Sequence, residues 1–154
     1  MIVCRNMKSS DTLQVYALVN SNLDGSFSLE VIEYFLSFWP EGQYVAVDLF
    51  GNIVGVLCGT RMANGRASIS LFAVDAKYRG QGIGRRLLDS FKTKCYMEGY
   101  REIQLELRIT NSVAHKFYVK NGFEIVEKVY NLYGENEHGY RMVAKLKDIS
   151  HVSS

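Results

Sequence analysis

A glycine-rich segment joins a strand pattern to a helix pattern near the middle of the chain and limits how the chain can fold. Residues 78–86 read Tyr-Arg-Gly-Gln-Gly-Ile-Gly-Arg-Arg, with glycine at 80, 82 and 84. Glycine adopts backbone conformations that other residues avoid, and it lets a ligand approach the main chain closely. The first N–H groups of a helix have no partner within the helix and carry the positive end of its dipole. The segment therefore predicts a phosphate-binding turn, with a flexible turn that binds nothing as the alternative.

The spacing of the glycines excludes two common phosphate-binding loops. A dinucleotide-binding loop requires Gly-x-Gly-x-x-Gly, but the last required position is Arg85 when counted from Gly80. Counted from Gly82, it is Leu87. A P-loop ends in Gly-Lys-Ser or Gly-Lys-Thr, whereas Gly84 is followed by two arginines. If the loop binds a phosphate compound, that compound is therefore of another kind, and a flexible turn that binds nothing stays the alternative.

Hydrophobic periodicity predicts one domain of α/β (α+β) type at residues 1–149, followed by a frayed tail at residues 150–154. Strong turn signals, such as Asn64-Gly65, separate the expected elements. The order of the helices and strands given below predicts a mixed sheet with helices on both faces. The expected helices are residues 11–20, 29–38, 84–98 and 111–121. The expected strands are residues 2–7, 44–48, 53–62, 67–74, 103–109, 123–132 and 140–146, with a polar loop between the last two.

Composition and charge exclude several classes of protein. Apolar residues make up 47% of the 154 residues and the net charge is only +2, so nothing indicates a nucleic-acid partner. No apolar stretch reaches the roughly 18 residues that would cross a bilayer, so we expect no membrane partner. The cysteines at 4, 58 and 95 are too few and too scattered for a disulfide framework or a metal site. We expect free thiols, no metal and a cytoplasmic location. Residues 76–88 hold basic side chains and no acid, which fits either a solvated face or an anion site.

A second motif narrows the interpretation. Residues 105–111 read Leu-Glu-Leu-Arg-Ile-Thr-Asn, and Ala114, Phe117-Tyr118 and Gly122-Phe123 follow them. The pattern Arg-x-x-Gly-x-Gly at residues 79–84 resembles the acetyl-CoA signature of the GNAT acyltransferase superfamily. The second motif resembles the RimI-type branch of that superfamily, the N-terminal protein acetyltransferases. This resemblance implies the GNAT fold, a mixed sheet of about seven strands flanked by about four helices.

The resemblance also implies where acetyl-CoA, the cosubstrate, binds. The backbone of the expected strand at residues 67–74 would pair with the pantetheine arm. A bulge in this strand would aim an N–H at the thioester carbonyl. The loop amides would hold the pyrophosphate. Asn111 would contact CoA, cap the helix that it begins, or do both. The residues implied to contact the cosubstrate are Phe72, Ala73, Val74, Arg79, Gly80, Gln81, Gly82, Ile83, Gly84, Arg85, Asn111 and Tyr118.

Two side chains match the catalytic positions of the family. An ammonium group has no lone pair, so acetylation of an amine requires a base that removes a proton, directly or through water. The resemblance implies Glu106 as this base, although by spacing alone a solvent-facing charge on an amphipathic strand is the simpler interpretation. It implies Tyr118 as the acid that protonates the departing thiolate, with a tyrosine packed beside Phe117 as the alternative. No cysteine lies in a motif for a covalent intermediate, so we expect direct attack by the amine.

Two segments match the acceptor-binding positions of the branch. Leu23 and Phe27 lie in the first, between the first two expected helices, and Tyr130 and Tyr133 lie before the final turn. The partner implied by the resemblance is the N-terminus of a protein or peptide, which would lie between these segments. Exposed strand tyrosines are the alternative for the second segment. A lysine side chain, a small amine, or a CoA-binding domain without turnover are the other functions considered, and an auxiliary subunit or ribosome association is left open.

Overall fold

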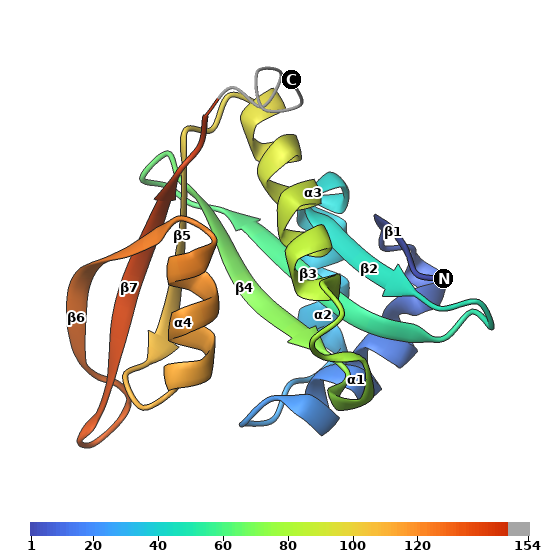
Figure 1. Ribbon diagram of the computed structural model, residues 1–154, viewed down its shortest axis with the longest axis horizontal. Coiled ribbons are helices and arrows are strands. Elements are labelled where there is room, and N and C mark those ends of the chain that lie inside the picture. Colours follow the sequence, from blue (N-terminus) through green and yellow to red (C-terminus); the bar gives the residue numbers. More distant parts are fainter. Residues whose placement is uncertain (148–154) are drawn as a thin grey trace.

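The computed structural model describes residues 1–147, and these build one seven-stranded sheet with helices on both faces (Figure 1). The strand order is β1-β2-β3-β4-β5-β7-β6, and all neighbouring strands are antiparallel except β4 and β5. The strands are β1 Val3–Asn6, β2 Gln43–Val47, β3 Ile53–Arg61, β4 Ala67–Val74, β5 Glu102–Arg108, β6 Phe123–Gly134 and β7 Glu137–Lys145. The α-helices of the described chain are α1 Thr12–Asn22, α2 Leu29–Phe38, α3 Ile83–Met97 and α4 Ser112–Lys120. The expected fold class is confirmed, and the expected tail lies outside the described residues.

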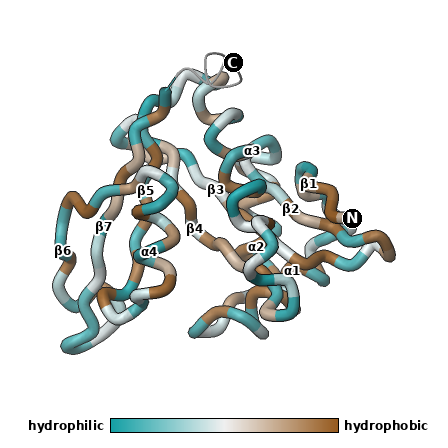
Figure 2. Tube along the Cα trace, in the orientation of Figure 1, coloured by the Kyte–Doolittle hydropathy of each residue, from teal (hydrophilic) through white to brown (hydrophobic). Residues whose placement is uncertain are grey.

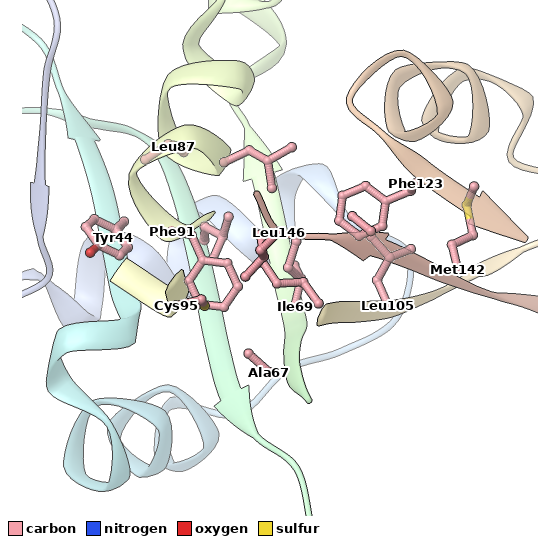
Figure 3. Close-up of a cluster of buried hydrophobic side chains, with 14 of the residues drawn as sticks. Tyr44, Ala67, Ile69, Leu87, Phe91, Cys95, Leu105, Phe123, Met142 and Leu146 are labelled. Carbon is pink, nitrogen blue, oxygen red and sulfur yellow. The ribbon is translucent and has the colours of Figure 1, made fainter. Parts of the chain in front are cut away.

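Two apolar layers hold the helices on the sheet. On one face, Val15 and Val19 of α1 and Ile32 of α2 are fully buried against the strands. On the other face, Leu87 and Phe91 of α3 are fully buried in a cluster with residues of β2, β4, β5 and β7 (Figure 3). Burying one such side chain contributes about 1.5–3 kcal/mol. Because each face of the sheet has its own layer, a one-residue slip of any central strand would expose its apolar set.

Hydrophilic and hydrophobic residues are mixed along the helices (Figure 2). Among the described residues, no helix is long and apolar enough to cross a membrane. The pattern is that of helices with one packed face.

Local signals explain several helix ends. The Ser28 hydroxyl accepts a hydrogen bond from the Val31 N–H at 3.2 Å and so caps α2. Trp39 then ends α2, because the residue before a proline avoids the helical conformation. The expected range of 29–38 for this helix is confirmed.

The expected polar loop between the last two strands is wrong. β6 continues to Gly134 and β7 already begins at Glu137, so the turn holds only two residues, and Asn136 takes a positive φ of 59° there. The hairpin lies at the edge of the sheet, and most of the β6 side chains face solvent. Polar residues are therefore compatible with strand at this position, and hydropathy gives no signal for where strand ends.

Candidate active site

The sheet opens between β4 and β5, the strands that bracket the predicted site. Their parallel pairing is limited to Ala67 with Ile103 and Ser68 with Gln104. Beyond these residues the two strands diverge, as Figure 1 shows. The β5-facing backbone edge of residues 69–74 has no strand partner in the described chain. An extended ligand can therefore add to this edge by main-chain hydrogen bonds.

A bulge lies in the same part of β4. Cys58 of β3 pairs with Leu71, but the next residue, Gly59, pairs with Ile69, so Ser70 is left out of the ladder. A bulge of this kind redirects the backbone groups around it. Phe72, Ala73 and Val74, the residues implied to bind the pantetheine arm, begin two residues after Ser70. Their ligand contacts stay a prediction.

The glycine loop presents the N-terminus of α3. Gly82 is the residue before the helix and has a φ of 79°, and Gly80 has a φ of 80°, both in the left-handed region that favours glycine. No side chain caps α3, so its first N–H groups keep their capacity to bind an anion. This geometry is what a pyrophosphate requires. The same turn holds the other residues implied to bind the cosubstrate, Gln81, Ile83, Gly84 and Arg85. The Arg85 Nε lies 3.7 Å from Asp89 Oδ2.

Arg79 has a structural use at this turn. Its Nε donates to the Val74 carbonyl at 3.1 Å and its Nη2 donates to Asn22 Oδ1 at 3.4 Å. Asn22 Oδ1 also accepts a hydrogen bond from the Ala76 N–H at 3.2 Å. Arg79 and Asn22 thus tie the glycine loop to the end of α1. A direct contact between the Arg79 side chain and CoA stays a prediction.

Glu106 lies on the opened part of the sheet. It follows Gln104, the last β5 residue that pairs with β4, by two positions. Leu105 and Leu107 are buried in the core below α3 and α4, so Glu106 projects from the opposite face, as expected from the alternation. Its side chain is 29% exposed, and no hydrogen bond to it occurs within the described chain. A half-exposed carboxylate with unused lone pairs can accept a proton from an amine or from a bridging water.

Tyr118 lies across the opening on α4. Its ring packs against Phe72 of β4 at 6.3 Å between centroids, and against Phe117 and Phe123 at 5.4 Å each. Burial among these rings, and secondarily the neighbouring Tyr133, raises the pKa of the Tyr118 phenol above its usual value. The phenol therefore carries its proton at any physiological pH. It can donate that proton, or a hydrogen bond, to a sulfur that lies beside Phe72.

Asn111 caps α4. Its Oδ1 accepts a hydrogen bond from the Ala114 N–H at 3.1 Å, so the capping role that the sequence left open is confirmed. Contact with CoA stays a prediction.

The acceptor-side residues divide into two kinds. Leu23 and Phe27 are half-buried and pack against the core between α1, α2 and the sheet. Asn20 fixes Phe27 by hydrogen bonds to its N–H at 2.9 Å and its carbonyl at 3.0 Å. Both residues therefore anchor the α1–α2 segment, and acceptor binding by them stays a prediction.

The structure separates the two predicted tyrosines. Burial and the charge of Glu106 raise the pKa of Tyr133, while Arg108, whose Cζ lies 4.4 Å from the ring centre, opposes this. Tyr133 is thus a neighbour of the predicted base. Tyr130 is 67% exposed and packs on His138, at 5.1 Å between ring centroids. Four residues of β6, 130–133, bulge out opposite His138, whose Nδ1 accepts the Asn131 N–H at 2.9 Å.

Two charged residues beside Glu106 were missed in the sequence. Arg141 of β7 is the direct cross-strand partner of Glu106 and also of Glu127 on β6. The Arg141 guanidinium lies 3.7 Å from Glu106 and 2.6 Å from Glu127. The alternation of β7 places Arg141 on one face, but only the register of the hairpin places it beside the predicted base.

Two of the three cysteines, Cys58 and Cys95, are buried. Burial raises the pKa of the Cys58 thiol to about 12 and that of the Cys95 thiol to about 12. Neither thiol supplies a thiolate at neutral pH. In the described residues, no group of three or more His, Cys, Asp or Glu side chains is placed to hold a metal ion.

The fold and the family that it matches are those of an acetyl-CoA-dependent N-acetyltransferase. Residues 12–123 match the family described as the acetyltransferase (GNAT) family, and the chain belongs to that family. The family expected from the two motifs is therefore confirmed.

Known proteins with similar sequence or structure include N-terminal acetyltransferases. N-alpha-acetyltransferase 30 of Saccharomyces cerevisiae is 30% identical over 141 residues, which cover 86% of this chain and 80% of that protein. The crystal structure of Ard1 from Thermoplasma volcanium has a TM-score of 0.90 at 29% identity, over 96% of this chain and 99% of that one. A chain of the NatC complex bound to Gag peptide and CoA has a TM-score of 0.85 at 27% identity, over 95% of this chain and 99% of that one.

Proposed function

We propose that this chain transfers the acetyl group of acetyl-CoA to the α-amino group of a protein or peptide N-terminus. The position of Glu106 carries this proposal, because its carboxylate stands where β5 has parted from β4 and has no hydrogen-bond partner in the described chain. The similar chain of the NatC complex was solved with a peptide and CoA, and the yeast relative is an N-alpha-acetyltransferase. Both support a peptide acceptor.

The residues around the opening fit acetyl-CoA. The N–H groups at the start of α3 would bind its pyrophosphate, and the unpaired edge of residues 69–74 would bind the pantetheine arm. The thioester would then lie between the bulge at Ser70 and Tyr118. An N–H near the bulge would stabilise negative charge on the thioester oxygen as the amine attacks.

An α-amino group suits the base that the site offers. With a pKa near 7.7–8.0, about a third of α-amino groups are neutral at pH 7.5, against about one in a thousand lysine side chains. Glu106 then needs only to take up a proton from the amine, directly or through one water. The nitrogen attacks the thioester carbon, the C–S bond breaks, and the thiolate leaves with a proton from Tyr118. The acetyl group passes directly to nitrogen without a covalent enzyme intermediate.

The compartment and partners follow from the same chemistry. Nascent protein N-termini and acetyl-CoA meet in the cytoplasm, and the free thiols at Cys58 and Cys95 suit a reducing compartment. We therefore place the proposed reaction there. The similar chain of NatC acts within a complex. Activity of the isolated chain would show that no auxiliary subunit is required.

The test is the release of CoA thiol by the purified chain. The acceptors are short peptides with free N-termini, the same peptides N-terminally blocked but containing lysine, and polyamines. We expect release with free N-termini alone, and a loss of at least a hundredfold in kcat in a Glu106→Gln variant that still binds CoA. Release only with lysine peptides or polyamines would overturn the acceptor assignment. CoA binding without any release would refute turnover by the isolated chain.

A further inference from the structure

Three charged side chains lie in one row across three neighbouring strands. Glu106 of β5, Arg141 of β7 and Glu127 of β6 are direct cross-strand partners, with the arginine in the middle. Side chains directly opposite on adjacent antiparallel strands lie on the same face. One cation is thus shared between the predicted base and a second carboxylate on the edge strand.

The sharing is unequal. Arg141 Nη1 donates a hydrogen bond to Glu127 Oε1 at 2.6 Å, whereas Nη2 lies 3.7 Å from Glu106 Oε1, which is too long for a hydrogen bond. The Arg141 Nε is buried and has no partner in the described chain. Most buried donors in folded proteins are hydrogen-bonded, so this unpaired Nε requires an explanation. The orientation of the guanidinium is therefore set by Glu127 at the expense of its other contacts.

This orientation matters for a base. An arginine that grips a carboxylate by two charge-assisted hydrogen bonds occupies its lone pairs and competes with any other cation. The acceptor arrives as an ammonium ion or as the amine that forms from it, and it needs a free oxygen of Glu106. Because Glu127 holds the guanidinium, one oxygen of Glu106 stays free to bind the acceptor amine. Arg141 still lies close enough to Glu106 to restrict other contacts of the carboxylate.

We propose that Glu127 and Arg141 are positioning residues for Glu106, in which Glu127 draws the guanidinium away and leaves the base open to the acceptor amine. The inference rests on the proposed function, since it concerns the base of that reaction. The carboxylate of Glu127 is 54% exposed and is not required to touch substrate or cosubstrate.

The test is a double-mutant cycle on initial rates with a free N-terminal peptide. Glu127→Gln removes the charge that holds Arg141, so the guanidinium swings to Glu106. We expect the KM for the peptide to rise and kcat/KM to fall about tenfold, with the KM for acetyl-CoA unchanged. In an Arg141→Met background, Glu127→Gln has no further effect, because no guanidinium is left to compete. Arg141→Gln is the alternative background if the methionine variant does not fold.

A second ion pair on β5 provides the matched control. Glu102 accepts from Arg66 Nε at 3.1 Å at the other end of the strand. Glu102→Gln removes a comparable interaction and should leave the peptide KM unchanged, with a thermal midpoint like that of Glu127→Gln. No loss on Glu127→Gln, or an equal loss in both Arg141 backgrounds, overturns the inference. Failure of the proposed function is distinct, because then the wild type does not turn over free N-termini or the Glu106→Gln variant stays active.

Discussion

Replacement of Gly82 by alanine tests whether the start of α3 is the cosubstrate site. Gly82 has a φ of 79°, and a Cβ added there would meet no atom within 4 Å. The substitution therefore creates no clash, and its whole effect is backbone strain. An alanine in the left-handed region costs about 1–2 kcal/mol. In the unliganded protein the loop can relax, but the bound conformation restores the strain.

The expected result is selective weakening of cosubstrate binding. If all of the strain opposes binding, 1–2 kcal/mol raises the KM for acetyl-CoA and the Kd for CoA by about 5–30-fold. The values of kcat and of the peptide KM should change little, because Glu106 and Tyr118 are untouched. Initial-rate kinetics with each substrate varied, together with calorimetric titration of CoA, measure these constants.

Gly65→Ala is the matched control. Gly65 lies in the β3–β4 turn with a φ of 85° and also has nothing within 4 Å of an added Cβ. It carries the same strain at a place that the proposed site does not include. Gly65→Ala should lower the thermal midpoint by about 2–4 °C for each kcal/mol of strain, with the KM for acetyl-CoA unchanged. An unchanged KM for acetyl-CoA in Gly82→Ala, or an equal increase in Gly65→Ala, would refute the assignment of the loop.

Three further predictions follow from the contacts. Tyr118→Phe keeps the packing on Phe72 but removes the proton donor, so kcat should fall about a hundredfold with the Kd for CoA unchanged. Because burial raises the pKa of Tyr118, deprotonation of this phenol should not lower the wild-type kcat up to pH 10. Arg5 Nη1 donates a hydrogen bond to Asp11 Oδ2 at 2.7 Å and lowers the pKa of that carboxyl. The ion pair therefore stabilises the fold fully above the unfolded pKa of about 3.9. This stabilisation is lost as the pH falls through the lower folded pKa. The free energies of unfolding of the wild type and Asp11→Asn in urea should therefore differ at pH 6, and the difference should shrink as the pH falls below about 3.9. Phe91 is fully buried against Trp39, and Phe91→Ala should lower the free energy of unfolding by about 3–5 kcal/mol in the same assay.

The helices and the central strands could be predicted because their signals are local. Ser28 and Asn111 cap the helices that follow them, and Trp39-Pro40 ends α2 where the sequence indicated. Glu106 could be assigned to a face because Leu105 and Leu107 alternate with it and are buried. In each case the residue and the interaction that fixes its conformation are only a few positions apart.

The surroundings of Glu106 could not be predicted because they depend on register. β6 is interrupted by two irregularities, between Ile125 and Glu127 and again over residues 130–133. Each shifts which β6 residue faces β7, and neither leaves a hydrophobic pattern on this exposed edge. Without that register, Glu127 and Arg141 are two ordinary surface charges. The interaction between them is therefore information that only the paired hairpin contains.

Within the described residues, the opening between β4 and β5 departs most clearly from regular strand pairing. Residues 69–74 are apolar and strand-forming, yet one backbone edge of this stretch has no strand partner within the described residues. Unpaired backbone donors and acceptors in the middle of a sheet are unfavourable, and proteins retain such exceptions mainly where a ligand completes them. The bulge at Ser70 and the uncapped start of α3 lie at the two ends of the same edge. One extended molecule with an anionic group at one end and a carbonyl at the other would satisfy all three features, and acetyl-CoA has that shape.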